Sequence, residues 1–125
     1  MPDSEDEWTV ERHLAGQPDS SVELYDAFIR TMEGFGPFTY RVTKTMITLK
    51  GTQRGFAGAR PDRAGLRGYF DLQREVRDRR ITSASPFSRL LTVHHFRIAT
   101  PADLDGQFVE WLREAYAVGN GVHVQ

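Results

Sequence analysis

The hydrophobic periodicity of the chain changes twice, and this change constrains the fold more than any other feature of the sequence. Residues 20–34 and 100–119 each repeat apolar side chains at the three- and four-residue spacing of an amphipathic helix. Between them, residues 38–98 contain short runs of β-branched and aromatic residues, which favour strands. The helical stripes are Val22, Tyr25, Phe28, Ile29 and Met32 in the first helix, and Leu104, Phe108, Trp111, Leu112, Ala115 and Tyr116 in the second.

Both predicted helices carry start signals. Ser20, with Glu23 three residues later, has the spacing of a capping box, which satisfies two free amides of the first turn. Gly34 follows the stripe and ends the first helix. Thr100 is the expected N-cap of the second helix, with Pro101 at its first position.

The strand-like segments are separated by turn sequences. Residues 51–54 and 61–65 have strong turn chemistry, and residues 73–89, which are charged and then rich in Ser and Pro, predict a long irregular segment. The expected strands are 38–42, 45–50, 56–59, 66–72 and 90–98. Because both helices need a sheet face to cover, we predict an α+β two-layer sandwich. It has an antiparallel sheet of four to five strands, flanked in sequence by an N-terminal and a C-terminal helix, with the second sheet face open to solvent.

The chain is expected to form one domain. We predict an acidic disordered tail over 1–7, a single α+β domain over 8–119 that begins with a short amphipathic piece, and a C-terminal tail over 120–125. The absence of cysteine excludes disulfides, thiolate metal sites and cysteine nucleophiles. No apolar run approaches the ~18–20 residues of a membrane helix, and the acidic N-terminus lacks a signal-peptide pattern. We therefore expect a cytoplasmic protein that does not engage a membrane.

Charge is distributed unevenly along the chain although the net charge is only −1. Residues 1–40 hold nine acids and two bases, and residues 101–125 hold four acids and one base. Residues 41–100, which form the predicted strands, hold four acids and thirteen bases. Since the helices carry most of the acids, we expect the open sheet face to be basic. An uneven charge distribution of this kind indicates which partners the surface attracts and does not indicate the fold.

Several short motifs, in this order, resemble a bacterial family of small domains that often occurs in actinobacteria, domain of unknown function 5655. The motifs lie at residues 8–10, 13–16, 36–38, 43–45, 54–57, 93–96, 104–105, 111–112 and 115–116, so the resemblance spans nearly the whole chain. It implies a stand-alone or fused cytoplasmic domain. It brings no catalytic residues with it.

His94 and His95 are the first candidates for chemistry. Neighbouring strand residues point to opposite faces, so we expect one histidine to face the helices with Phe96 and the other to face solvent with Arg97. Either His95 or His94, oriented by Asp71, is a candidate acid–base couple. No spacing in the sequence favours a metal, and we expect no metal and no cofactor.

The arginines form the strongest collective signal, because their planar fork suits carboxylate and phosphate. The loop arginines Arg74, Arg77, Arg79 and Arg80 are expected to form a solvated charged segment. The predicted ligand-binding residues are Lys44, Arg41, Arg54, Arg67, Arg97 and Tyr40.

Three hypotheses follow. The first is a non-enzymatic binding module whose arginine-rich sheet face holds an anionic small molecule or an acidic protein partner. The alternative is a small cofactor-free enzyme that uses His94 or His95 with Asp71, and Lys44 or Arg97 to stabilise an anion. The third is single-stranded nucleic-acid binding, which exposed aromatics beside the arginines would support. A homodimer formed through a sheet edge is compatible with each of them.

Overall fold

Six antiparallel strands form one sheet in the computed structural model, which describes residues 7–121. The strands are β1 Thr39–Val42, β2 Ile47–Lys50, β3 Gly55–Asp62, β4 Gly65–Leu72, β5 Ile81–Ser88 and β6 Leu91–Ile98. Their order in the sheet is β1-β2-β3-β4-β6-β5, so β1 to β4 form a meander and the β5–β6 hairpin joins it through β6. The tails predicted over 1–7 and 120–125 fall largely on residues 1–6 and 122–125, which lie outside the described residues.

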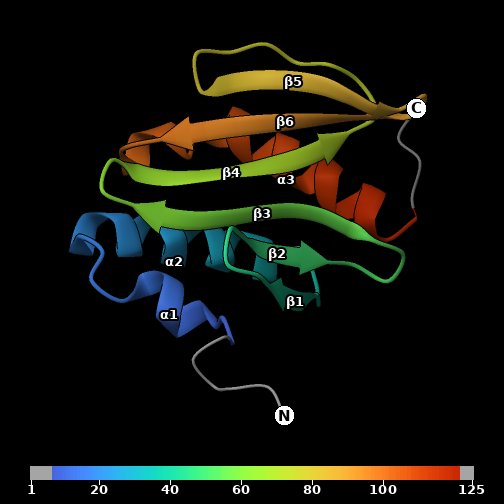
Figure 1. The fold of residues 1–125 in the computed structure, drawn as a ribbon. Coiled ribbons are helices and arrows are strands. Elements are labelled where there is room, and N and C mark those ends of the chain that lie inside the picture. Colours follow the sequence, from blue (N-terminus) through green and yellow to red (C-terminus); the bar gives the residue numbers. More distant parts are fainter. Residues whose placement is uncertain (1–6, 122–125) are drawn as a thin grey trace.

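Two long helices cover one face of this sheet. Helix α2 (Asp19–Glu33) and helix α3 (Gly106–Gly119) both contact β3 and β4 and lie on the same side of the sheet (Figure 1). The short helix α1 (Val10–Leu14) is tied to the β1–β2 turn, where the His13 ring Nε2 lies 2.7 Å from the Thr43 carbonyl oxygen. The predicted α+β two-layer sandwich is confirmed, with six strands instead of the four to five expected. No helix in the described part of the chain could span a membrane.

The alternation of side chains along β4 separates the core from the second face. Leu66, Phe70 and Leu72 are fully buried against the helices, and the rings of Phe28, Phe96, Phe108 and Trp111 surround them. The intervening Arg67 and Tyr69 point the other way, where no helix lies. The core-facing residues therefore fix the direction of the side chains between them, and these form a polar face on the other side of the sheet.

Strand β5 corrects the prediction of a long irregular segment over 73–89. It is an edge strand that pairs only with β6, through two irregularities in register, and most of its side chains are exposed. A strand that is solvated on both faces needs no alternating apolar pattern, and an edge position tolerates Pro86. The sequence therefore carries no periodic signal for it.

Both helix starts also differ from prediction. The N-cap of α2 is Pro18 rather than Ser20, and the helix makes no side-chain cap. At the second helix, the capping box of Thr100 and Asp103 closes a 3₁₀ turn over Pro101–Asp103 instead. Helix α3 begins later, with the Asp105 carboxylate accepting the Phe108 amide.

Arg80 is not part of a solvated charged segment. Its side chain is only 5% exposed and forms ion pairs with Asp78 at 2.7 Å and Asp105 at 2.8 Å. It also donates to the Asp103 carbonyl at 2.7 Å, and its guanidinium lies over the rings of Phe108 and Trp111. Arg80 therefore fastens the start of β5 to the start of α3.

Candidate functional site

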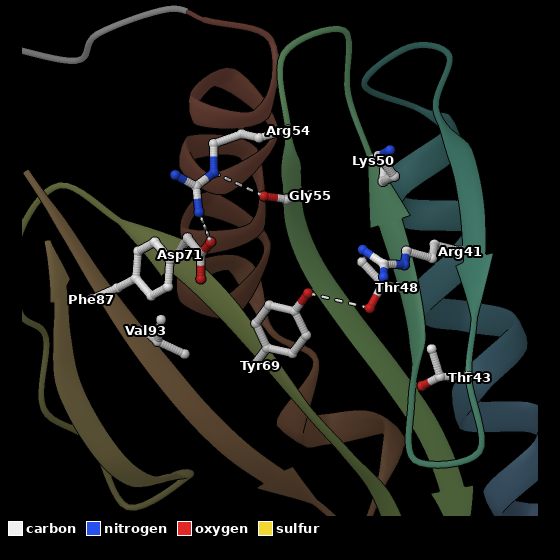
Figure 2. A pocket seen from close by; sticks show the side chains of 10 residues that line it. All are labelled: Arg41, Thr43, Thr48, Lys50, Arg54, Gly55, Tyr69, Asp71, Phe87 and Val93. Atoms are coloured by element: carbon white, nitrogen blue, oxygen red, sulfur yellow. Dashed lines mark hydrogen bonds and ion pairs between the residues drawn. The ribbon is translucent and has the colours of Figure 1, made fainter.

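A cavity of about 320 Å³ opens on the sheet face that the helices leave uncovered (Figure 2). We call it the Asp71 cavity. Its lining comes from all six strands of the sheet and from the β1–β2 and β2–β3 turns, and includes Arg41, Thr43, Thr48, Lys50, Arg54, Gly55, Tyr69, Asp71, Phe87 and Val93. Sequence-distant segments thus meet here because the meander and the β5–β6 hairpin share one sheet.

Strand register explains why these side chains converge. Arg41 of β1 lies opposite Thr48 of β2, and Asp71 of β4 lies opposite Val93 of β6. The β2–β3 pairing shifts register between Leu49 and Lys50, next to the turn that carries Arg54. Figure 2 shows Arg54 reaching from this turn toward Asp71, across the end of β3.

Asp71 is the only carboxylate that lines the cavity, and it is 3% exposed. Its Oδ2 accepts from the Arg54 guanidinium at 3.3 Å, while its Oδ1 is buried with no hydrogen-bond partner. Burial raises the pKa of Asp71 from 3.8 to about 6, against the opposing attraction of Arg54. Asp71 therefore exchanges its proton near pH 6, and its Oδ1 is a buried acceptor that no group in the described residues satisfies.

Tyr69 forms the floor of the cavity. Its hydroxyl donates to Thr48 Oγ1 at 3.4 Å, and burial raises its pKa, so it stays protonated near neutral pH. The ring lies over Gly58 on β3, where an added Cβ would stand 2.8 Å from Tyr69 Cε1. Glycine at position 58 thus provides the space in which Tyr69 lies flat against the sheet.

Positive charge exceeds negative charge in this cavity. Arg41, Lys50 and Arg54 line it, against the single carboxyl group of Asp71. Among residues 7–121, Arg54 pairs with Asp71, whereas Arg41 and Lys50 have no ion-pair partner. Two cations beside a hydroxyl and a buried carboxyl group form an arrangement suited to an anion that also accepts a hydrogen bond.

The predicted ligand-binding residues divide among four places. Arg41 and Arg54 line the Asp71 cavity, and Arg67 and Arg97 line a second cavity of about 270 Å³ on the same face. Lys44 is exposed in the β1–β2 turn and lines neither cavity. Tyr40 packs edge-on against Phe38 near the end of α2, outside the open face. Lys44 and Tyr40 are therefore not brought into the site.

The two histidines lie on opposite faces of β6, as their adjacency predicts. His94 is fully buried and stacked on Phe70; its Nε2 accepts the Val76 amide at 3.0 Å and its Nδ1 donates to the Thr92 carbonyl. Burial lowers the pKa of His94, so the ring is neutral. Because His94 lies among the helices and Asp71 on the other face, this acid–base couple does not form.

His95 lies on the open face, but in the second cavity. It is opposite Tyr69 in register, with ring centroids 6.3 Å apart, whereas the residue opposite Asp71 is Val93. The side chain that does contact Asp71 is Arg54. The structure thus replaces the predicted carboxylate–histidine couple with a carboxylate–arginine pair.

Lys50 and Thr48 were not singled out as ligand residues from the sequence. The alternation of side chains along β2 could have identified them: Ile47 and Leu49 are apolar and fully buried, so Thr48 and Lys50 between and after them must face the cavity. In residues 7–121 no cluster of three metal-ligating side chains is present.

The comparisons with known proteins agree with the resemblance seen in the sequence. Residues 10–119 match the sequence model of the family described as Domain of unknown function (DUF5655), and the chain belongs to this family. No curated protein and no solved structure matches the chain. The family description carries no activity, so a functional assignment has to come from the geometry of the open face.

Proposed function

We propose that this member of the DUF5655 family is a non-enzymatic binding module that holds a small organic anion in the Asp71 cavity. The single observation that carries the proposal is that Arg41, Lys50 and Arg54 line one cavity together with a single buried carboxyl group, which pairs with Arg54. A carboxylate or phosphate of the ligand would contact Arg41 and Lys50. Bidentate pairing with an arginine fork adds both energy and orientation to such a contact.

The size and shape of the cavity favour a small molecule over an acidic protein segment. Its volume of about 320 Å³ lies in the range typical of small-ligand sites. Phe87 and Val93 give it one apolar wall, beside the cations. Three cations line this one concavity, an arrangement that fits a single small anion.

Asp71 contributes selectivity in this proposal. An anion bound beside Asp71 disfavours the charged carboxylate and raises the pKa of Asp71 beyond about 6. The protonated carboxyl group then no longer repels the bound anion. Binding is therefore expected to take up a proton, and to weaken as the pH rises above about 7.

The two lysines of the chain supply a matched test. Lys50 lines the cavity, and Lys44 is exposed in the neighbouring turn, so Lys50→Met and Lys44→Met remove the same charge at different positions. Purified variants would be screened by thermal shift against small mono- and dicarboxylates and phosphate esters, and hits measured by calorimetry. We expect Lys50→Met to weaken binding by about tenfold, since hydrogen bonds to charged groups contribute ~1.5–3 kcal/mol. Equal effects of the two substitutions, or no hit at all, would refute the proposal.

A second candidate function is acid–base catalysis by Asp71. It is favoured by the pKa of about 6, because a group that titrates near the working pH is an effective proton carrier. Arg41 and Lys50 would stabilise an anionic intermediate. Turnover of a calorimetric hit, lost in Asp71→Asn while binding is kept, would establish this function instead of simple binding.

A further inference from the structure

Three arginines lie side by side across the open face, on adjacent strands. Arg60 of β3 is directly opposite Arg67 of β4, which is directly opposite Arg97 of β6. We call these residues the arginine row. Like charges directly opposite each other in antiparallel strands are destabilising, because their Cβ atoms stand only ~4.5–5.5 Å apart. A neutralising partner would therefore stabilise a row of three such charges.

The protein supplies only part of that neutralisation. Arg97 forms an ion pair with Asp62 at 3.1 Å. Arg60 and Arg67 have no ion-pair partner in the part of the chain that the structure describes, and the Nε of Arg60 is shielded from solvent without a hydrogen-bond acceptor. A shielded donor without an acceptor is unfavourable, and an anion in the cavity that Arg60 lines would offset this cost by neutralising the guanidinium charge.

The arginine row lines a cavity of its own. This cavity of about 270 Å³ also includes Thr45, Thr82 and His95, whose side chains offer further hydrogen-bonding groups. It is distinct from the Asp71 cavity, and the two have no lining residue in common. Tyr69 lies between Asp71 and Arg67 on β4 and separates them.

We infer that the arginine row is a second, separate anion site, which binds the phosphoryl group of a small molecule. A phosphoryl group matches the site better than a carboxylate, because its oxygens can accept from several guanidinium forks at once and its charge of nearly −2 balances the two unpaired arginines. Asp62 at the edge of the row holds Arg97 in position beside the ligand. This inference does not depend on what the Asp71 cavity binds.

The probe for the test is inorganic phosphate, titrated by calorimetry at low ionic strength against chloride of matched ionic strength. Arg67→Met removes the central charge of the row, and Arg63→Met removes the same charge from the exposed β3–β4 turn as a matched control. We expect Arg67→Met to weaken phosphate binding by at least about tenfold and Arg63→Met by less than about twofold. Phosphate that binds beside Lys50 in the Asp71 cavity would appear as a second site, which Lys50→Met weakens while it leaves the Arg67-dependent site within about twofold of the natural chain.

A second readout separates a binding role from a structural one. Without phosphate, Arg67→Met is expected to raise the melting temperature, because it removes two like-charge contacts across the sheet. Arg67→Lys keeps the charge but loses the fork, and should bind phosphate more weakly than the natural chain.

Several results would overturn the inference. They are the absence of phosphate binding, equal losses in Arg67→Met and Arg63→Met, or a melting temperature that falls in Arg67→Met without ligand. Loss of the Arg67-dependent site in Lys50→Met, as large as in Arg67→Met, would show one continuous site instead of two. Tighter binding of a short single-stranded oligonucleotide, with affinity falling steeply with salt, would assign the row to a nucleic-acid backbone instead.

Discussion

Replacing Asp71 with asparagine is expected to stabilise the protein at neutral pH. The pKa of Asp71 rises from 3.8 to about 6, so the folded state binds this proton more tightly than the unfolded chain does. Each pKa unit corresponds to about 1.4 kcal/mol, so the charged carboxylate reduces the free energy of unfolding by about 3 kcal/mol above pH ~7. Asparagine has the same shape, carries no charge and can still accept from Arg54.

The sign of the pH dependence follows from the raised pKa. Well below pH 3.8 Asp71 is protonated in both states, so the natural chain and Asp71→Asn should have similar stabilities. Between pH 3.8 and about 6, the natural chain loses stability relative to the variant as the pH rises. Above about pH 7 the difference is constant at its full value of about 3 kcal/mol, in favour of Asp71→Asn.

Urea unfolding followed by tryptophan fluorescence at several pH values measures this difference. Trp111 lies in the core against Phe70, so its emission reports loss of the fold. The difference between the two chains cancels the contributions of other titrating groups. A variant that is less stable than the natural chain at about pH 8, or a difference that does not change with pH, would refute the reasoning about Asp71.

Three further predictions concern the fold that supports the two cavities. Arg80→Met should lower the free energy of unfolding by about 3 kcal/mol in urea titrations, because it removes a buried guanidinium with two ion pairs. The lowered pKa of His94 means that stability should fall as the pH drops below 6.5, when the unfolded chain takes up a proton that the folded chain resists. His94→Leu should remove this pH dependence and lower the free energy of unfolding by about 1–3 kcal/mol, since the amide of Val76 loses its acceptor. An unchanged pH profile in His94→Leu would contradict the assignment of the pH dependence to His94. Gly68→Ala should lower the free energy of unfolding by about 2–3 kcal/mol, because the added Cβ would clash with a backbone carbonyl of β3 and stand 2.8 Å from Phe96 Cζ. Gly106→Ala is the control: its added Cβ has nothing within 4 Å, so the variant should unfold at the same or a higher urea concentration than the natural chain.

The parts of the fold that bury an apolar stripe could be predicted from the sequence. Phe28 and Met32 in α2, and Phe108 and Leu112 in α3, are fully buried as their helical spacing indicates. The opposite orientations of His94 and His95 followed from the two-residue period of a strand. Burial imposes a period on the sequence, and a period can be seen without a structure.

The parts that depend on pairing between distant segments could not be predicted. Strand β5 is held by backbone hydrogen bonds to β6 and buries little, so its side chains carry no pattern. Arg79 and Arg80 are neighbours in one charged stretch, and the sequence does not distinguish them. The fold buries the Arg80 side chain, whereas the Arg79 side chain stays exposed. The pairing of Asp71 with Arg54, instead of a histidine, depends on the turn that carries Arg54 across the sheet.

Buried polar atoms without a hydrogen-bond partner lie on both sides of the sheet, and the two on the open face belong to residues that line cavities. The third is the Tyr25 hydroxyl in α2, which lines neither cavity. His94, on the helix side, has partners for both ring nitrogens and is neutral, as a structural residue should be. On the open side, Asp71 keeps a buried oxygen without a partner, and Arg60 keeps a buried nitrogen without one. Each of these groups lowers the stability of the free protein, and each would be relieved by a ligand that the folded state alone can bind. Stability lost in the free protein and regained on binding is therefore the common physical signature that both cavities should show.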